Sequence, residues 1–147
     1  MANYVTPHAK HLLGAAGLNL STADLRVLLV MSNSTAAADL LTAEDLADIT
    51  TLDEHDGANY ARQPLANEAY AKDVPNARTE LDADDVTFAS LGAGTRQCIG
   101  AILYVHVDGT AANDIPIRWI DTPGFPFTAA GADFELRWNA EGVLQVA

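Results

Sequence analysis

The stretch RQCIGAILYVHV, residues 96–107, decides the fold of this 147-residue chain. Its apolar side chains occur at odd and even positions alike, so an extended strand here would have two apolar faces. Such a strand is typical of the centre of a sheet that is covered on both sides. We therefore expect a central, doubly covered strand. Its expected faces are Ile99, Ala101, Leu103, Val105 and Val107 on one side, and Ile102 and Tyr104 on the other.

Further β-patterns lie before and after this strand. Residues 27–31, VLLVM, form a second run that is apolar on both faces. Two later segments, 115–121 and 134–139, alternate instead, and large aromatic residues in such positions are expected in the core. The expected apolar faces are Ile115, Ile117 and Trp119 in the first, and Phe134, Leu136 and Trp138 in the second.

Two short helices are expected in the first third of the chain. Residues 6–17, TPHAKHLLGAAG, offer a threonine cap, a proline for the first turn, and Gly17 to end the helix in a left-handed conformation. A second helix is expected at about 42–49, where Thr42 and the aspartate three residues later resemble a helix-start box.

These patterns predict a mainly β protein, a single-domain antiparallel β-sandwich of jelly-roll or immunoglobulin-like type with one or two short N-terminal helices. Residues 1–20 are expected to form an N-terminal arm or short helix, and residues 21–147 the sandwich. Within the sandwich, residues 60–73 are expected to form one strand. Pro64 marks an edge or a bulge there, because proline cannot donate to a β-ladder.

The charge of the chain limits its partners. It has 8 Lys and Arg against 20 Asp and Glu, a formal net charge of −12. We expect no nucleic-acid and no membrane partner, because phosphate backbones and anionic lipids need a cationic surface.

No apolar run reaches the roughly 18–20 residues of a membrane span. The first residues lack a signal-peptide layout, so retention in the cytoplasm of the expressing cell is expected.

Residues suited to catalysis form no recognisable motif. Nucleotide-binding, zinc-protease and nucleophile-elbow patterns do not occur. His8 and His11 have a spacing that suits a metal, but zinc needs three or four protein ligands and no partner set accompanies them. Cys98, the one cysteine, is expected to be a small buried side chain. We expect no enzyme activity, no catalytic residue, no metal and no cofactor.

Two histidines and two acidic turns are weaker candidates. His55 is expected to be solvated in the acidic loop LDEHDG, and His106 to lie on a face of the central strand. The turns at 82–85 and 108–114 gather carboxylates, but turn formation already accounts for Asp there. Neither matches a calcium-binding loop, and a paired-carboxylate glycosidase would need a cleft that the sequence does not define.

Three segments carry a resemblance to a known group of proteins. They are LRVLLV at 25–30, DADDVTF at 82–88 and GADFELRWNAEG at 131–142. Together they resemble small structural proteins of tailed bacteriophages, over most of the chain from about Pro7 onward. The resemblance implies a virion protein that is made in the host cytoplasm and binds the major capsid protein or other virion proteins. The segments carry no catalytic signature, so the resemblance assigns no functional residue.

A capsid decoration (cement) protein is the leading interpretation, because such proteins are often small and β-rich. The nearest alternative is a tail or head–tail connection protein. An alternative of another class is a carbohydrate-binding module, which would expose aromatic side chains on one face. For a virion subunit we also expect self-association as a trimer or dimer, since closed symmetry satisfies every identical patch.

The N-terminal 20 residues are the expected interface. They contain Lys10 and no carboxylate, and they place apolar side chains before the first clear strand. On an acidic protein, this predicts a docking arm that orders against a neighbouring subunit or the capsid shell. The alternative is that the helix covers one end of its own sandwich. The expected contact residues are Tyr4, Val5, Leu12 and Leu13.

Overall fold

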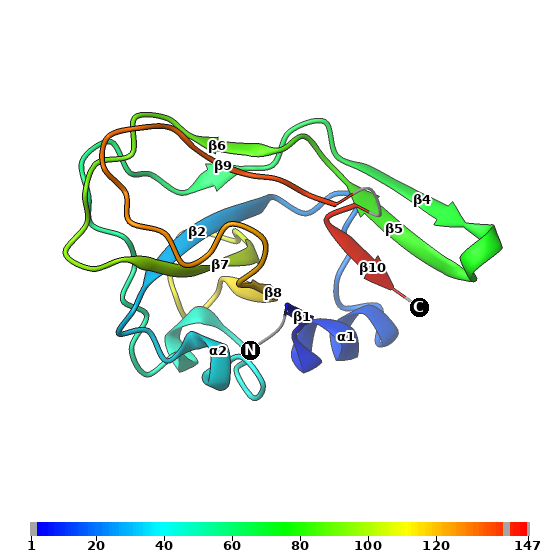
Figure 1. Cartoon of the computed structure of the whole chain (residues 1–147). Helices are drawn as coiled ribbons and strands as arrows, with labels where there is room; N and C mark the ends of the chain where they lie inside the picture. Colours follow the sequence, from blue (N-terminus) through cyan, green and yellow to red (C-terminus); the bar gives the residue numbers. More distant parts are fainter. Residues whose placement is uncertain (1–2, 140–141, 147) are drawn as a thin grey trace.

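The computed structural model describes residues 3–139 and 142–146 (Figure 1). Over these residues ten strands form three antiparallel sheets, which confirms the predicted mainly β sandwich. The strands are β1 (Tyr4–Val5), β2 (Leu25–Met31), β3 (Gln63–Pro64), β4 (Ala69–Asp73), β5 (Arg78–Asp82), β6 (Val86–Phe88), β7 (Cys98–Val105), β8 (Ile115–Ile120), β9 (Phe134–Leu136) and β10 (Leu144–Val146). The helices are α1 (Pro7–Gly14), α2 (Ala36–Asp39) and the 3₁₀ turns η1 (Leu46–Asp48) and η2 (Val74–Asn76).

The main sheet has the strand order β1-β8-β7-β2-β3. β7 lies at its centre, where Ile102 pairs with Leu28 of β2 on one side and with Trp119 of β8 on the other. This confirms the central position predicted for residues 96–107.

Along the described chain, no helix has the length and apolar character needed to cross a lipid bilayer.

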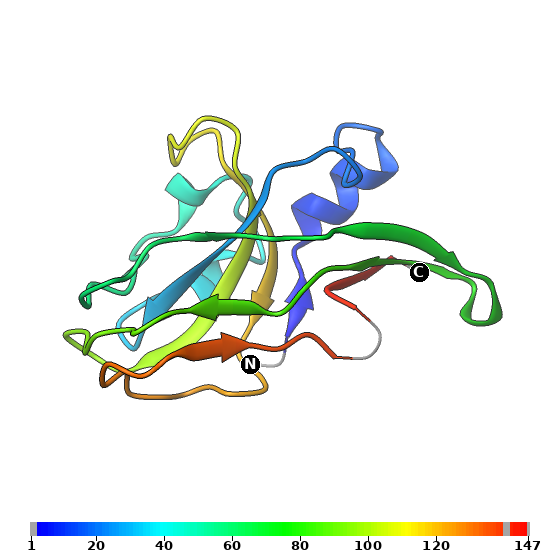
Figure 2. The same ribbon diagram turned by 90° about the horizontal axis from the view of Figure 1, so that it is seen from above.

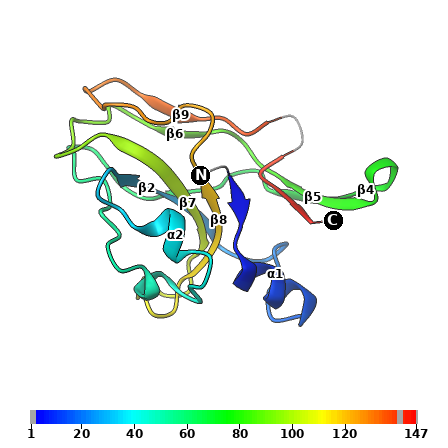
Figure 3. The same cartoon turned by 60° about the horizontal axis from the view of Figure 1, so that its bottom comes forward.

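Both faces of the main sheet are covered. The ribbon of β6 and β9 lies over one face, and α2 with the loop that follows it lies over the other (Figures 1 and 3). The first core cluster includes Val27, Leu29, Leu103, Val86, Phe88 and Leu136. The second includes Leu28, Val30, Ile102, Tyr104, Trp119, Ala36, Leu40 and Leu46.

The β4–β5 hairpin, residues 69–82, projects from this body with η2 at its tip (Figure 2). β10 pairs with β5 and completes a three-stranded sheet at the base of the projection. Four of the five residues of β4 are exposed, so the hairpin gains little stability from core packing.

Two β-bulges change the faces predicted for the main sheet. Val30 pairs with Gly100 and Met31 with Cys98, so Ile99 is left unpaired and packs against the second cluster. A one-residue shift moves a side chain to the opposite face, and the face predicted for Ile99 was therefore wrong. Val107 lies beyond the end of β7 and is 55% exposed, which is a second error in the predicted face.

A second shift separates the residues predicted to share a face in β8. Leu103 pairs with Arg118 and Tyr104 with Pro116, so Ile117 has no direct partner in β7. Ile117 then packs in the first cluster and Trp119 in the second, although the alternating pattern predicted one shared face. Trp119 is buried as expected.

The α-helix predicted at 42–49 does not form. The structure has α2 before this span and, within it, the single 3₁₀ turn η1. Asp45 caps η1 by accepting hydrogen bonds from the backbone amides of Ala47 and Asp48. Thr42 instead donates its hydroxyl to the carbonyl of Asp39. Burial of Leu46 in the second cluster holds this turn in place, which a local pattern cannot show.

Residues 60–73 form two short strands rather than the one predicted. β3 pairs with β2 at the edge of the main sheet, while β4 pairs with β5 in the three-stranded sheet. Between them Leu65 is buried, and its amide donates to the carbonyl of Leu25. Pro64 lies in the edge strand, as expected.

The N-terminal segment packs against the main sheet. β1 pairs with β8, and α1 follows after Thr6, whose side chain accepts a hydrogen bond from the Ala9 amide at 3.2 Å. Residues 3–20 therefore form one body with the sandwich, as in the alternative in which the helix covers its own sandwich. The left-handed residue after α1 is Ala16, with φ 57°, rather than Gly17.

Thr6→Ala is expected to lower the free energy of unfolding by about 1–2 kcal/mol. Thr6 is fully buried, and its hydroxyl also donates to the carbonyl of Pro116 at 3.0 Å, so alanine leaves two backbone groups without a partner. Urea unfolding measures the loss. Thr6→Ser keeps the hydroxyl and is the control: equal losses in both variants would assign the effect to methyl packing instead.

Candidate functional site: a cleft between two sheet edges

The four residues predicted to form an interface are all half-buried against their own chain. The Tyr4 hydroxyl donates to the carbonyl of Ala37 at 2.7 Å, while Val5 and Leu13 pack against the first core cluster. Leu12 lies on α1, next to Leu13 in the sequence. The segment therefore packs against its own sandwich, and its contact with another protein stays a prediction.

His55 and Cys98 form a buried pair. The Nε2 atom of His55 lies 3.0 Å from the carbonyl oxygen of Gly92, and its Nδ1 atom lies 3.3 Å from the Cys98 sulfur. A carbonyl only accepts, so Nε2 holds the proton and Nδ1 accepts from the thiol. His55 is 4% exposed, and the expectation of a solvated side chain was wrong. Gly57 and Gly94 let the backbone lie against the ring, where a Cβ would clash with it.

Burial raises the pKa of Cys98 to about 11. The burial predicted for Cys98 is confirmed, and the pair holds a thiol at neutral pH rather than the reactive thiolate. We expect no labelling by a disulfide reagent at about pH 8 in the folded protein, and labelling of one thiol after urea unfolding. Rapid labelling without urea would contradict this burial.

The raised pKa also predicts a loss of stability in alkali. Because the thiol ionises more readily in the unfolded chain, its contribution is full below pH 9.0 and is lost as the pH rises through about 11. Burial raises the pKa of Tyr60 as well, in the same direction. Unfolding free energies across this range should fall less steeply in Cys98→Ala; an equal slope would exclude the thiol as a cause.

The acidic turns use their carboxylates for the protein's own hydrogen bonds. Asp85 accepts from the backbone amide of Trp138, and Asp108 accepts from the amide of Thr110. Asp114 is fully buried and accepts from the Val107 amide at 2.8 Å. Among the residues that the structure describes, no group of three or more His, Cys, Asp or Glu side chains is placed to hold a metal ion.

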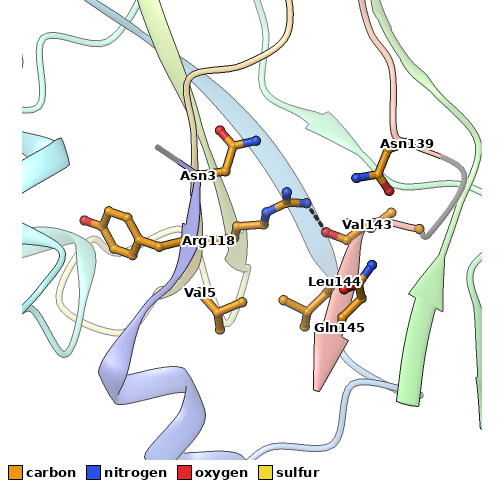
Figure 4. Close-up of a pocket in the computed structure, with 9 residues that line it drawn as sticks. Asn3, Val5, Arg118, Asn139, Val143, Leu144 and Gln145 are labelled. Carbon is orange, nitrogen blue, oxygen red and sulfur yellow. Dashed lines mark hydrogen bonds between the residues drawn. The ribbon is translucent and has the colours of Figure 1, made fainter. Parts of the chain in front are cut away.

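A cleft lies between β1, at the edge of the main sheet, and β10, at the edge of the three-stranded sheet (Figure 4). It consists of two pockets of about 210 and 160 Å³ that share Asn3, Arg118 and Asn139. We call it the Arg118 cleft. The first pocket is also lined by Tyr4, Val5, Gly142, Val143, Leu144 and Gln145, and the second by Ile120, Thr122, Pro123, Arg137 and Trp138.

Arg118 lies at the centre of the cleft. Its side chain extends from β8 toward β10, and its guanidinium donates to the carbonyl of Val143 (Figure 4). Burial lowers the pKa of this guanidinium below its ordinary value. The sequence pattern does not identify Arg118 as a site residue, because the residue that it contacts is 25 positions away in the chain.

The β4–β5 hairpin is the second candidate surface. Val74 is 78% exposed and Tyr70 is 40% exposed, although both are large apolar side chains. Leu41 and Val107 are the other exposed large apolar residues in the described part of the chain, and both lie outside the hairpin. Exposed apolar side chains on a projecting hairpin are suited to contact another protein.

Arg118 and the projecting hairpin are thus two features of the described residues that suit binding. Comparisons of the chain with protein-family models, with curated proteins and with solved structures found no match.

Proposed function

We propose that this chain is a structural virion protein of a tailed bacteriophage, and specifically a capsid decoration (cement) protein that binds the major capsid shell. The resemblance of its sequence segments supports the virion, and the β4–β5 hairpin carries the argument for docking. The hairpin projects from a body whose main sheet is covered on both faces, and it exposes Val74 and Tyr70.

The physical properties of the chain suit a protein that coats a shell. A sandwich with a closed core keeps its shape on many identical sites, so each copy presents the same hairpin to the same neighbour. The net charge of −12 favours a basic protein patch as partner over nucleic acid or an anionic membrane. Self-association as a trimer or dimer belongs to the same proposal.

The interpretation as a carbohydrate-binding module predicts exposed aromatic side chains on one face, and neither tryptophan is exposed. Such a module needs exposed aromatic rings on one face. Trp119 is buried, and Trp138 is half-buried with its indole N–H donating to the carbonyl of Asp84. In the described part of the chain, Tyr70 is the one aromatic residue among the exposed large apolar side chains.

Co-sedimentation with phage particles that lack the protein tests the proposal. The wild-type chain is expected to bind, and Val74→Asp is expected to weaken binding by about tenfold or more, because it places a charge at the hairpin tip. Leu41→Asp, the same change at an exposed apolar residue outside the hairpin, is the control. Failure of the wild-type chain to bind would overturn the proposal.

Electron cryomicroscopy of the particles with bound protein gives its position. Added density on the capsid shell supports decoration. Density confined to the tail or the neck would overturn decoration in favour of the tail or head–tail alternative.

A further inference from the structure

Arg118 differs from every other arginine of the chain. Five of the six arginines pair with a carboxylate, whereas within the described residues Arg118 has none. This is unexpected in a chain with 20 acidic residues. The pairs are Arg26 with Asp24, Arg62 with Glu54, Arg78 with Asp73 and Glu80, Arg96 with Asp53, and Arg137 with Glu135.

The surroundings of Arg118 leave it able to bind. A guanidinium has five N–H donors, and the carbonyl of Val143 is the one acceptor that the described residues supply. Partial burial removes water from the cation without a compensating charge, which is why its pKa is lowered. The cost of that burial is recovered when an anion enters the cleft.

The cleft suits a carboxylate better than a phosphate. Its other polar walls are neutral amides, Asn3, Asn139 and Gln145, so a single positive charge faces the first pocket. Arg137 borders the second pocket, but it is already paired with Glu135 at 2.5 Å. On a chain of net charge −12, one guanidinium matches a monoanion, and its two parallel N–H groups match the two oxygens of a carboxylate.

We propose that the Arg118 cleft binds a carboxylate, supplied by an Asp or Glu side chain of the protein onto which this chain docks. The ligand's source rests on the proposed docking function, whereas carboxylate binding itself does not. The edge strands β1 and β10 flank the cleft, so an extended segment that bears the acidic residue has a backbone edge on each side.

A peptide titration tests the site without any phage particle. The probes are the blocked tripeptide Gly-Glu-Gly and its Gly-Gln-Gly counterpart, followed through the arginine Nε–H signals in NMR spectra. The Arg118 signal, assigned by its loss in Arg118→Lys, is expected to shift saturably with the Glu peptide only, with a weak Kd of about 1–100 mM. Arg26, which is half-buried and paired with Asp24, is the internal control. Equal shifts with both peptides, or none, would overturn the site.

Particle binding tests the source of the carboxylate. Arg118→Met is expected to weaken binding by about tenfold or more, whereas Arg137→Met, in the same cleft but already paired, is expected to have a small effect. Urea unfolding of both variants checks that they are folded. Peptide binding together with unchanged particle binding by Arg118→Met would overturn the assignment to the docking partner. Absence of particle binding by the wild type would overturn the docking function. The peptide titration alone would then decide whether the Arg118 cleft binds a carboxylate.

Discussion

Trp119→Ala is expected to lower the free energy of unfolding by about 3–5 kcal/mol. The side chain is 1% exposed and packs in the second core cluster between the main sheet and the segment of α2. Alanine removes the whole ring and leaves a cavity that neighbouring strands, held in register by their pairing with β7, do not fill. Urea unfolding measures the loss, and a value under about 1 kcal/mol would contradict this packing.

Trp138→Ala is the matched control for that experiment. The sequence pattern predicts equal burial for both tryptophans, and hence an equal loss of 3–5 kcal/mol for either. In the structure Trp138 is half-buried at the margin of the first cluster, so its removal should cost clearly less than that of Trp119. Equal losses would show that Trp138 is packed more tightly than described.

Gly100→Ala is expected to cost about 1–3 kcal/mol, although it adds a single methyl group. A Cβ at this position would lie 2.4 Å from the Cη2 atom of Trp119 and 2.9 Å from the carbonyl oxygen of Ile120. The backbone oxygen is held by the β7–β8 pairing and the ring is enclosed by the second cluster, so neither moves away freely.

A double-mutant cycle identifies the ring as the cause. Trp119→Phe removes the outer ring atoms that a methyl group at Gly100 would meet. Gly100→Ala should therefore cost less in the Trp119→Phe background than in the wild type, with a coupling of about 0.5–3 kcal/mol. Additive losses would assign the cost to Ile120 and the backbone instead.

The central strand and its two apolar faces could be predicted because the pattern is long and continuous. The errors at Ile99 and Trp119 have one physical cause: a bulge adds a residue to one strand, and the choice of where it forms depends on the partner strand. The edge position of Pro64 was predictable because it follows from a missing N–H group. The short turn capped by Asp45 could not be predicted, because burial of Leu46 in the second cluster decides where it forms.

The candidate site was less accessible to sequence reasoning than the fold. The apolar N-terminal residues were predicted to contact a partner, and that contact stays a prediction. In the structure Val5 and Leu13 pack against the core of their own chain, and Tyr4 and Val5 line the cleft. Arg118 was missed because the absence of a partner is visible only when the whole chain is in place. His55 was misassigned because the glycines that enclose it, Gly57 and Gly94, carry no signal of burial in a pattern.

The order of strands in the main sheet has a consequence during synthesis on the ribosome. β1 and β2 are made first, yet their partner strands come much later in the chain. Tyr4 of β1 pairs with Trp119 of β8, and Leu28 of β2 pairs with Ile102 of β7. Asn3 donates to the carbonyl of Thr122 across 119 positions. At roughly 5–20 residues per second, the apolar segment 27–31 emerges several seconds before β7 can cover it. During that interval the uncovered apolar strand is prone to aggregate.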